Sequence, residues 1–369
     1  MNIFATEEEQ LDFQDVLIAP QKSDVQSRKD VDITKTYKFK HSGKEVIGSP
    51  VIAANMISCG TFEIARHLQQ HKMFTALHKY YDPDEIIKFL EKNKQEFGNN
   101  DYIIISSGIR QGDFERMKRV LDTGLCDKVR LDCPNGYISN FTAHINKVRH
   151  YYPDLIIFAG NVVTSEKTRE LINKGADVAV NGIGGGAQCL SRQKAGIGRP
   201  QLSMLMDCIY PIRQEHAYLC SDGGITCPGD IAKALAVSDF VMIGSMFGTT
   251  EEADGKVIER QKQTGYMIDG KPEIVTQKFK EVFGTSSRKA QEVTTGKVAE
   301  YRASEGRVLE VPVSGSIEDV VKDIEGGLRS CATYVGARNI DEMQSNIRFY
   351  KVRRQLNTNL VNKSVKSRD

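Results

Sequence analysis

The segment Gly182–Cys189 joins four glycines to a cysteine and is the part of the chain best suited to covalent chemistry. Because glycine has no side chain, the carbonyl and N–H groups of such a loop can converge on an ion or a ligand. A cysteine at its tip, close to Arg192, is a candidate thiolate nucleophile. The alternative is a loop cysteine without a chemical role.

The same segment, GIGGGAQC, partly matches the glycine-rich fingerprint of dinucleotide-binding folds. That fingerprint needs a helix that begins at once and an acidic residue about twenty positions further on. Here the glycines lead instead to Cys189, to the polar stretch Ser191–Lys194 and to a second pair, Gly196 and Gly198. We therefore interpret the segment as a long functional loop and reject the dinucleotide fold.

Polar or small residues also follow each of eight short apolar runs. These run ends are Asn55, His78 with Lys79, Ser106 with Ser107, Asp132, Asn161, Asn181, Asp222, and Gly244 with Ser245. Any one of them alone is typical of a turn. Together they predict a site, provided that the fold brings the run ends to one face.

The elements that must position these residues are strands alternating with amphipathic helices. The runs are Pro50–Ala54, Met73–His78, Tyr102–Ser106, Lys128–Asp132, Leu155–Ala159, Val178–Asn181, Ala217–Ser221 and Phe240–Gly244. Their starts lie 23 to 39 residues apart, which suits one strand and one crossover helix, such as Phe62–His71 or the helix opened by Pro228. We predict a closed (β/α)8 TIM barrel, an α/β fold in which strand ends converge on one face.

Glycine-rich turns follow the last two predicted strands. Asp222 precedes Gly223, and Gly244 precedes Ser245. In many barrels the turns after strands seven and eight bind phosphate, which would leave Asp222 to accept from ribose hydroxyls. The alternative is that Asp-Gly-Gly is an ordinary turn.

Composition and charge limit which classes of protein function remain possible. The 50 Lys and Arg nearly balance the 48 Asp and Glu, which does not favour nucleic-acid binding. No apolar run is long enough for a membrane helix, and the acidic start MNIFATEEEQLDF predicts a cytoplasmic protein. The eight cysteines form no C-x-x-C pair, so we expect them to be reduced.

Domain organisation follows from the same patterns. We expect one barrel domain over residues 1–345, which includes a polar insertion at 248–282 that folds as a flap. A basic C-terminal tail is expected at 346–369.

Several longer stretches carry a resemblance to a known family. They include Leu11–Leu17 (LDFQDVL), Leu131–Tyr137 (LDCPNGY), Gly182–Gln201, Ser221–Lys233 (SDGGITCPGDIAK) and Ala299–Gly306 (AEYRASEG). On these residues the chain resembles the IMP dehydrogenase/GMP reductase family over nearly its whole length. The run AEYRASEG is typical of the reductase side, and the short connection between His78 and Tyr102 leaves no room for a CBS domain.

The resemblance implies an NADPH-dependent oxidoreductase that converts GMP to IMP and ammonia. In such an enzyme the catalytic Cys189 forms a thioimidate with the purine, and Ser191 and Glu305 handle the proton traffic. The resemblance also implies a homotetramer that takes a purine nucleoside monophosphate as its small-molecule substrate.

The binding residues implied by the resemblance fall into three groups. Substrate contacts are expected from Asp222, Gly223, Gly244, Ser245, Ser286 and Arg302. Cofactor and reacting-centre contacts are expected from Lys79, Ser107, Asp132 and Asn161. A potassium ion is expected on the carbonyls of Gly182, Gly184 and Cys189.

The chain departs from the family pattern at a few positions that bear on base preference. These are Ala187, Ser191, Ser245, Thr285 and Ile57, where the family usually has Ser, Thr, Gly, Met and Asp. Two alternatives therefore stand beside the main interpretation. One is a related purine-nucleotide oxidoreductase with another base preference or with IMP dehydrogenase activity. The other is a barrel that binds nucleotides without catalysis.

Overall fold

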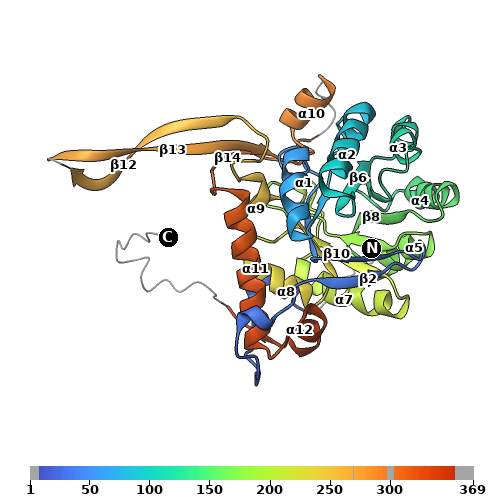
Figure 1. Ribbon diagram of the computed structural model, residues 1–369, viewed down its shortest axis with the longest axis horizontal. Helices are drawn as coiled ribbons and strands as arrows, with labels where there is room; N and C mark the ends of the chain where they lie inside the picture. Colours follow the sequence, from blue (N-terminus) through green and yellow to red (C-terminus); the bar gives the residue numbers. More distant parts are fainter. Residues whose placement is uncertain (1–7, 269, 297–302, 354–369) are drawn as a thin grey trace, which may run out of the picture.

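A closed barrel of eight parallel strands forms the centre of the computed structural model, which describes residues 8–268, 270–296 and 303–353 (Figure 1). Around the barrel the strands follow the order β10-β11-β4-β5-β6-β7-β8-β9. Their bounds are β4 Val51–Ala53, β5 Phe74–Ala76, β6 Ile103–Ser107, β7 Lys128–Asp132, β8 Ile156–Val162, β9 Val178–Asn181, β10 Tyr218–Asp222 and β11 Phe240–Ile243. The predicted TIM barrel and its eight strands are confirmed.

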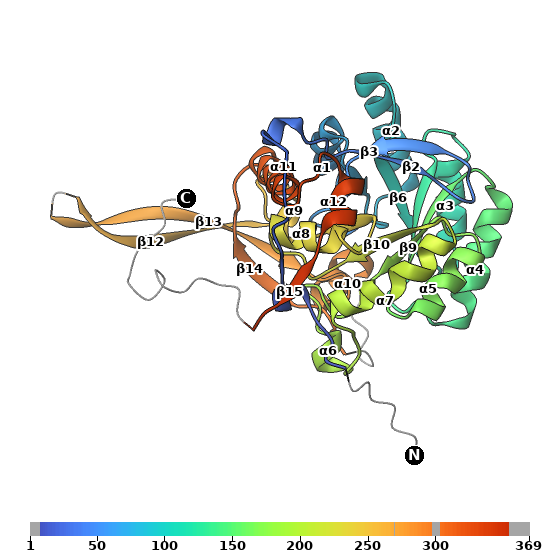
Figure 2. The same cartoon turned by 90° about the horizontal axis from the view of Figure 1, so that it is seen from below.

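Helices surround the barrel and cover its outer face (Figures 1 and 2). The helices of the described residues are α1 Phe62–Leu68, α2 Pro83–Phe97, α3 Asp113–Leu121, α4 Ser139–Tyr151, α5 Ser165–Asn173, α6 Ser191–Lys194, α7 Gln201–Gln214, α8 Pro228–Leu235, α9 Ser245–Gly248, α10 Arg288–Thr295, α11 Ile317–Tyr334 and α12 Ile340–Asn346, of which the short α6 and α9 lie in the loops after β9 and β11. Short 3-10 turns occupy Phe13–Asp15, Arg28–Asp30 and Gln69–His71. Sequence-local caps set several starts: the Thr61 hydroxyl accepts from the N–H of Ile64, and Asp82 forms a capping box before Pro83.

An N-terminal hairpin closes the end of the barrel where the strands begin. It consists of β2 (Lys35–Lys38) and β3 (Glu45–Gly48). Tyr37 is fully buried there, stacks on Phe240 at a ring distance of 4.1 Å, and donates its hydroxyl to the carbonyl of Asp239 at 3.3 Å. This end is therefore filled by packing, which leaves the opposite end for the polar strand ends.

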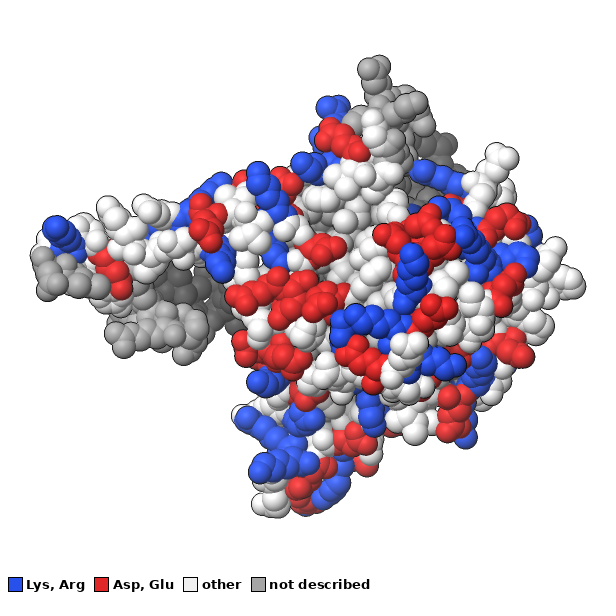
Figure 3. Space-filling model, turned by 45° about the horizontal axis from the view of Figure 1, so that its top comes forward, with Lys and Arg blue, Asp and Glu red and all other residues white. Residues whose placement is uncertain are grey.

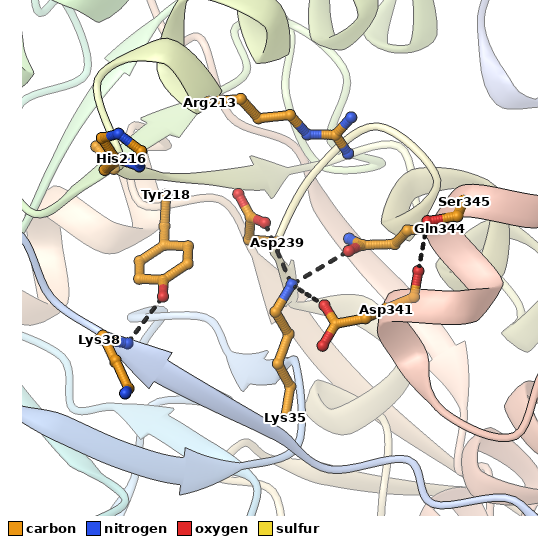
Figure 4. Close-up of a pocket in the computed structure, with 10 residues that line it drawn as sticks. Lys35, Lys38, Arg213, His216, Tyr218, Asp239, Asp341, Gln344 and Ser345 are labelled. Carbon is orange, nitrogen blue, oxygen red and sulfur yellow. Dashed lines mark hydrogen bonds and ion pairs between the residues drawn. The ribbon is translucent and has the colours of Figure 1, made fainter.

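A hollow of about 490 Å³ lies beside this closed end (Figure 4). In it the Lys35 ammonium lies 2.6 Å from the carboxylate of Asp341 and 3.7 Å from that of Asp239. The side chains that line it come from β2, α7, α12 and the starts of β10 and β11. The hollow is thus at the far end of the barrel from the strand ends that were predicted to form the site.

A long hairpin projects from the side of the barrel (Figures 1 and 2). Strand β12 (Val257–Ile268) pairs antiparallel with β13 (Lys271–Phe283), and β13 pairs with β14 (Val308–Pro312). Strand β12 and all but the last residue of β13 lie within the predicted insertion at 248–282, whereas β14 lies beyond it, after α10. The role of the insertion as a flap stays a prediction.

Near the C-terminus, β15 (Phe349–Lys351) pairs antiparallel with β1 (Val16–Ile18). Part of the predicted basic tail is therefore tied to the body of the protein. On the face shown in Figure 3, positive and negative side chains are interspersed. Among the described residues, no helix is both long and apolar enough to cross a membrane.

Candidate active site

The loop that carries Cys189 is held by a segment more than a hundred residues further along the chain. Cys189 forms an isolated antiparallel bridge with Gly306. The N–H of Leu190 donates to the carbonyl of Glu305 at 2.7 Å, and the N–H of Arg307 donates to the carbonyl of Gln188 at 2.9 Å. These backbone hydrogen bonds pair residues 188–190 of the glycine-rich loop with residues 305–307.

Three predicted catalytic side chains form one hydrogen-bonded chain at this bridge. The Cys189 thiol donates to the Ser191 hydroxyl at 3.4 Å, and the Ser191 hydroxyl donates to a carboxylate oxygen of Glu305 at 2.6 Å. Ser191 opens the short helix α6, and all three residues are only partly buried. A nucleophile, a hydroxyl and a carboxylate in this order can pass a proton between a bound ligand and the carboxylate.

Most of the other cysteines are buried and suited to packing. Burial raises the pKa of Cys59 to about 12, and that of Cys208 and of Cys331 to about 11, which keeps these thiols protonated near neutral pH. Cys227 is the exposed one, at the start of α8. All eight lie in the described residues and are free.

The glycine turns after β9 and β10 touch one another. A Cβ added to Gly223 would lie 3.1 Å from the backbone nitrogen of Gly186, and one added to Gly182 would collide with the carbonyl of Asp222. Both positions have a positive φ, 98° at Gly223 and 153° at Gly182. The described residues offer no acceptor to the N–H groups of Gly185, Gly186, Gly223 and Gly224. These groups are thus available to an anion.

Gly244 and Ser245 lie at the end of β11, where Ser245 begins α9. A Cβ on Gly244 would approach the sulfur of Met56 to 2.8 Å, so a side chain here would require Met56 to move. The predicted phosphate residues therefore all occupy turns at the ends of adjacent strands.

The carboxylate of Asp132 lies at the end of β7 and is held by cations. Lys79, just beyond β5, donates to it at 2.7 Å. Burial alone would raise the pKa of Asp132, but Lys79, Arg130 and a hydrogen bond from Asn55 together hold it below its usual value. Asp132 is therefore ionised throughout the neutral range.

A small pocket beside Lys79 is lined by Ser107, Gly108, Asp113 and Arg116. The Ser107 hydroxyl there donates to the carbonyls of Gly108 and Asp113. Lys79 and Ser107 thus line one pocket.

Asn161, at the end of β8, joins this group to Asp222. Its amide donates to a carboxylate oxygen of Asp222 at 2.7 Å and to the carbonyl of Gly182 at 2.8 Å. Burial raises the pKa of Asp222, and the Asn161 hydrogen bond and the charge of Arg130 oppose that rise. A continuous set of contacts therefore joins the cysteine loop to Asp132, Asn161 and Asp222.

Arg130 was not among the predicted site residues, although its side chain is fully buried and contacts Asn161 and Asp132. In the sequence it lies inside the strand run KVRLD. A charged residue in the middle of a buried parallel strand was the signal that could have revealed it.

The remaining predicted residues lie around the loop. Ser286 is half-buried in the turn between β13 and α10, and the N–H of nearby Gly284 donates to the carbonyl of Arg307 at 3.0 Å. The departures Ala187 and Thr285 are exposed. Arg302 lies outside the described residues.

Comparisons with known proteins agree with this geometry. A family model described as "IMP dehydrogenase / GMP reductase domain" matches residues 10–358. "GMP reductase 1" of Mus musculus is 43% identical over 94% of this chain and 96% of its own length. "GMP reductase" of Onchocerca volvulus is 42% identical over 95% and 93%, and "GMP reductase 2" of Homo sapiens is 42% identical over 94% and 95%. With its barrel, its cysteine loop and this match, the chain belongs to the IMP dehydrogenase/GMP reductase family.

Proposed function

We propose that this protein reductively deaminates GMP: GMP, NADPH and two protons give IMP, NADP⁺ and ammonium. The observation that carries the proposal is the hydrogen-bonded chain Cys189–Ser191–Glu305 at the barrel mouth. It rests equally on relatives named GMP reductase that align over most of the chain.

Cys189 is the proposed nucleophile. Its thiolate adds to C2 of the purine, the C2–N bond breaks, and the amino group leaves as ammonia, so that a thioimidate links sulfur to C2. Reduction at C2 then breaks the C–S bond and returns the thiolate. Dividing one difficult displacement into two easier steps is the gain that a covalent nucleophile provides.

Ser191 and Glu305 are the proposed proton carriers. The leaving amine needs a proton, and the Ser191 hydroxyl lies between the sulfur and the Glu305 carboxylate. A proton held at Glu305 can reach the substrate through this hydroxyl, because each link is within hydrogen-bond distance.

The nucleotide is proposed to sit across the turns that follow β9, β10 and β11. The carboxylate of Asp222 accepts from the ribose hydroxyls, and the N–H groups of Gly223, Gly244 and Ser245 face the phosphate. Ser286 is proposed to contact the base, together with Arg302.

The cofactor is proposed to bind beside Lys79 and Ser107, with Asp132 and Asn161 at the reacting centre. The residues present fit an anionic cofactor, because Lys79 and Arg116 are cations that line the same pocket as Ser107. When bound, NADPH supplies a hydride to C2. Lys79 and Ser107 would hold it in place.

Further expectations belong to the same proposal. The carbonyls of Gly182, Gly184 and Cys189 are uncharged oxygens, which suit a potassium ion.

The projecting hairpin exposes Tyr266, Met267 and Ile274, and exposed apolar groups of this kind favour burial between subunits of a tetramer. The eight free thiols favour a reducing, cytoplasmic compartment.

The test follows NADPH absorbance while GMP, IMP, XMP and AMP are offered separately, with and without potassium. We expect oxidation with GMP, production of one IMP and one ammonium per NADPH, and no turnover by Cys189→Ala. Turnover with only another nucleotide would refute GMP as the substrate. Binding of nucleotide without any turnover would favour a non-catalytic barrel.

A further inference from the structure

Arg130 is a fully buried cation inside the barrel, on strand β7. Removing a charge from water is costly, and such a residue persists when it is paired and hydrogen-bonded. Its position is unusual for a packing residue, because the barrel interior is otherwise filled by side chains such as Phe158 and Phe240. The contacts of its guanidinium indicate which groups this buried charge holds in place.

The guanidinium is directed at groups of the barrel mouth. It donates to the carbonyls of Leu131 at 2.5 Å and Gly160 at 3.2 Å, and to the amide oxygen of Asn161. It also lies 3.7 Å from a carboxylate oxygen of Asp132. Its Nε has no partner among the described residues. The buried guanidinium thus joins the ends of β7 and β8, both of which belong to the proposed site.

The first consequence concerns the orientation of Asn161. Because an arginine can only donate, the amide group of Asn161 must turn its oxygen toward Arg130. The amide nitrogen then points to Asp222 and to the carbonyl of Gly182, at 2.7 Å and 2.8 Å. Arg130 therefore fixes the oxygen side of the amide whose nitrogen side holds one carboxylate oxygen of Asp222, and the other carboxylate oxygen is left for a ligand.

The second consequence concerns the end of strand β7. Arg130 lies 3.7 Å from a carboxylate oxygen of Asp132, to which Lys79 donates at 2.7 Å. Because Arg130 also donates to the carbonyls of Leu131 and Gly160, the same guanidinium joins the backbone of β7 to that of β8. The ends of the two strands that carry Asp132 and Asn161 are thus held together by one side chain.

We propose that Arg130 is a positioning residue of the active site: through Asn161 it holds the carboxylate of Asp222, the proposed ribose ligand, in a fixed orientation. It does so without touching the substrate, since its side chain is fully buried. The inference rests on the proposed function, because it takes Asp222 as the group that binds the ribose.

Two substitutions separate the charge of Arg130 from its shape. Arg130→Gln removes the charge, whereas Arg130→Lys keeps it but replaces the two guanidinium nitrogens that donate to Asn161 and to the carbonyls by a single nitrogen. The matched control is Lys128→Met, which removes another buried cation of β7, one that pairs with Asp127 at 2.6 Å. Each variant is compared with the wild type by thermal unfolding, by equilibrium dialysis of GMP, and by separate kcat and KM values for GMP.

Arg130→Gln should lower kcat/KM for GMP at least tenfold, since an oriented hydrogen bond to a charged group is lost. The loss should lie in KM and in the dissociation constant of GMP more than in kcat, because Arg130 orients the ribose-binding carboxylate and does not touch the substrate. Arg130→Lys should still bind GMP more weakly than the wild type, because a single nitrogen replaces the planar guanidinium. Lys128→Met should lower the unfolding temperature and leave GMP binding and KM unchanged.

Wild-type GMP affinity in Arg130→Gln would overturn the proposal, as would an equal loss of affinity in Lys128→Met. If Arg130→Gln does not fold, unchanged GMP affinity in Arg130→Lys overturns it. Dialysis keeps the two proposals apart. A wild type that binds GMP but does not oxidise NADPH refutes the proposed activity, while the GMP affinity of the variants still tests Arg130.

Discussion

At the scale of single residues, the Ser191 hydroxyl is the link on which the proposed proton transfer depends. It accepts from Cys189 and donates to Glu305, so both partners are held through one oxygen. Serine lacks the β-branch that restricts the side-chain torsion of threonine, so here the two hydrogen bonds supply the orientation.

Ser191→Ala should lower kcat by about a hundredfold or more, because general acid–base groups contribute about 10²–10⁴ to rates. Ser191→Thr keeps the hydroxyl and should retain most of the activity. Glu305→Gln should have an effect close to that of Ser191→Ala, and the double variant should be little worse than either, because the groups act as a unit. Steady-state NADPH oxidation measures all four. Additive losses would contradict a single relay.

His78 is a buried residue whose protonation opposes folding. It stacks on Tyr81 at 3.9 Å, its Nδ1 accepts from the N–H of Tyr80, and burial lowers its pKa to about 4. In an unfolded chain its pKa is about 6.5. Between these values the unfolded state binds the proton and the folded state does not, so stability falls as the pH falls.

The folding free energy that depends on neutral His78 is fully present above about pH 6.5 and is lost as the pH falls toward about 4. The loss amounts to at most about 3 kcal/mol. The unfolding temperature of the wild type should therefore drop between neutral pH and pH about 5 by more than that of His78→Gln. Calorimetric scans at both pH values measure the difference. Equal drops in the two proteins would show that His78 is not the group.

At the scale of elements, the base of the projecting hairpin depends on one buried lysine. Lys280 of β13 is 1% exposed and donates to the carbonyls of Thr250, Glu251 and Ala253. These carbonyls follow α9, which begins at the Gly244 turn of the proposed phosphate site. The hairpin is thus tied to the loop that leads away from the site.

Lys280→Met should leave these buried carbonyls without a donor and destabilise the region by about 1–3 kcal/mol. Hydrogen exchange should rise at residues 250–253 and at the start of the hairpin, and change little in the barrel strands. The control is Lys289→Met, which removes an ion pair with Glu281 at 3.5 Å whose lysine is 41% exposed, and such pairs contribute little. Uniform acceleration across the barrel would contradict a local anchor.

At the scale of the whole molecule, the two ends of the barrel have different tasks. The closed end contains Tyr37 stacked on Phe240, and the open end contains the polar strand ends. In barrels of this kind the first end maintains stability and the second carries the chemistry. Changes at the closed end should therefore act on folding and leave the kinetics of the folded enzyme intact.

Tyr37→Ala should lower the free energy of unfolding by about 3–5 kcal/mol, because it opens a cavity between the hairpin and the barrel. Tyr37→Phe keeps the ring and loses only the hydroxyl contact with the Asp239 carbonyl, so its effect should be about 1 kcal/mol. Denaturant unfolding measures both. KM for GMP in the folded fraction should stay at the wild-type value, and a large rise would refute the separation of the two ends.

Much of the fold was predictable because a parallel barrel strand is buried on both faces and therefore appears as a continuous apolar run. The predicted run Lys128–Asp132 coincides with β7. Strand β8 extends beyond the predicted Ala159 to Val162, because Val162 still pairs with Asn181. Such a pairing depends on the neighbouring strand and leaves no mark on the local sequence.

Less of the site was predictable from residue types alone. The glycine loop and its cysteine, and the polar residues at the strand ends, were visible as patterns. The partnership of Ser191 with Glu305 came from a resemblance, since 114 positions separate the two residues. Arg130 was read as part of a strand, because its importance arises from Asn161 and Asp132, which only the closed barrel brings to it.

The sequence by itself determined the eight strands, the helix starts at Thr61 and Pro228, and the loop that presents Cys189. Each of these depends on interactions between residues close in the chain, such as caps, turns and apolar periodicity. The tertiary structure alone decided that Glu305 meets Ser191, that the turns of Gly186 and Gly223 touch, and that Arg130 lies between two carboxylates. These contacts form only when barrel closure brings distant strand ends together, because the strength of a buried charge or hydrogen bond is set by its surroundings in space.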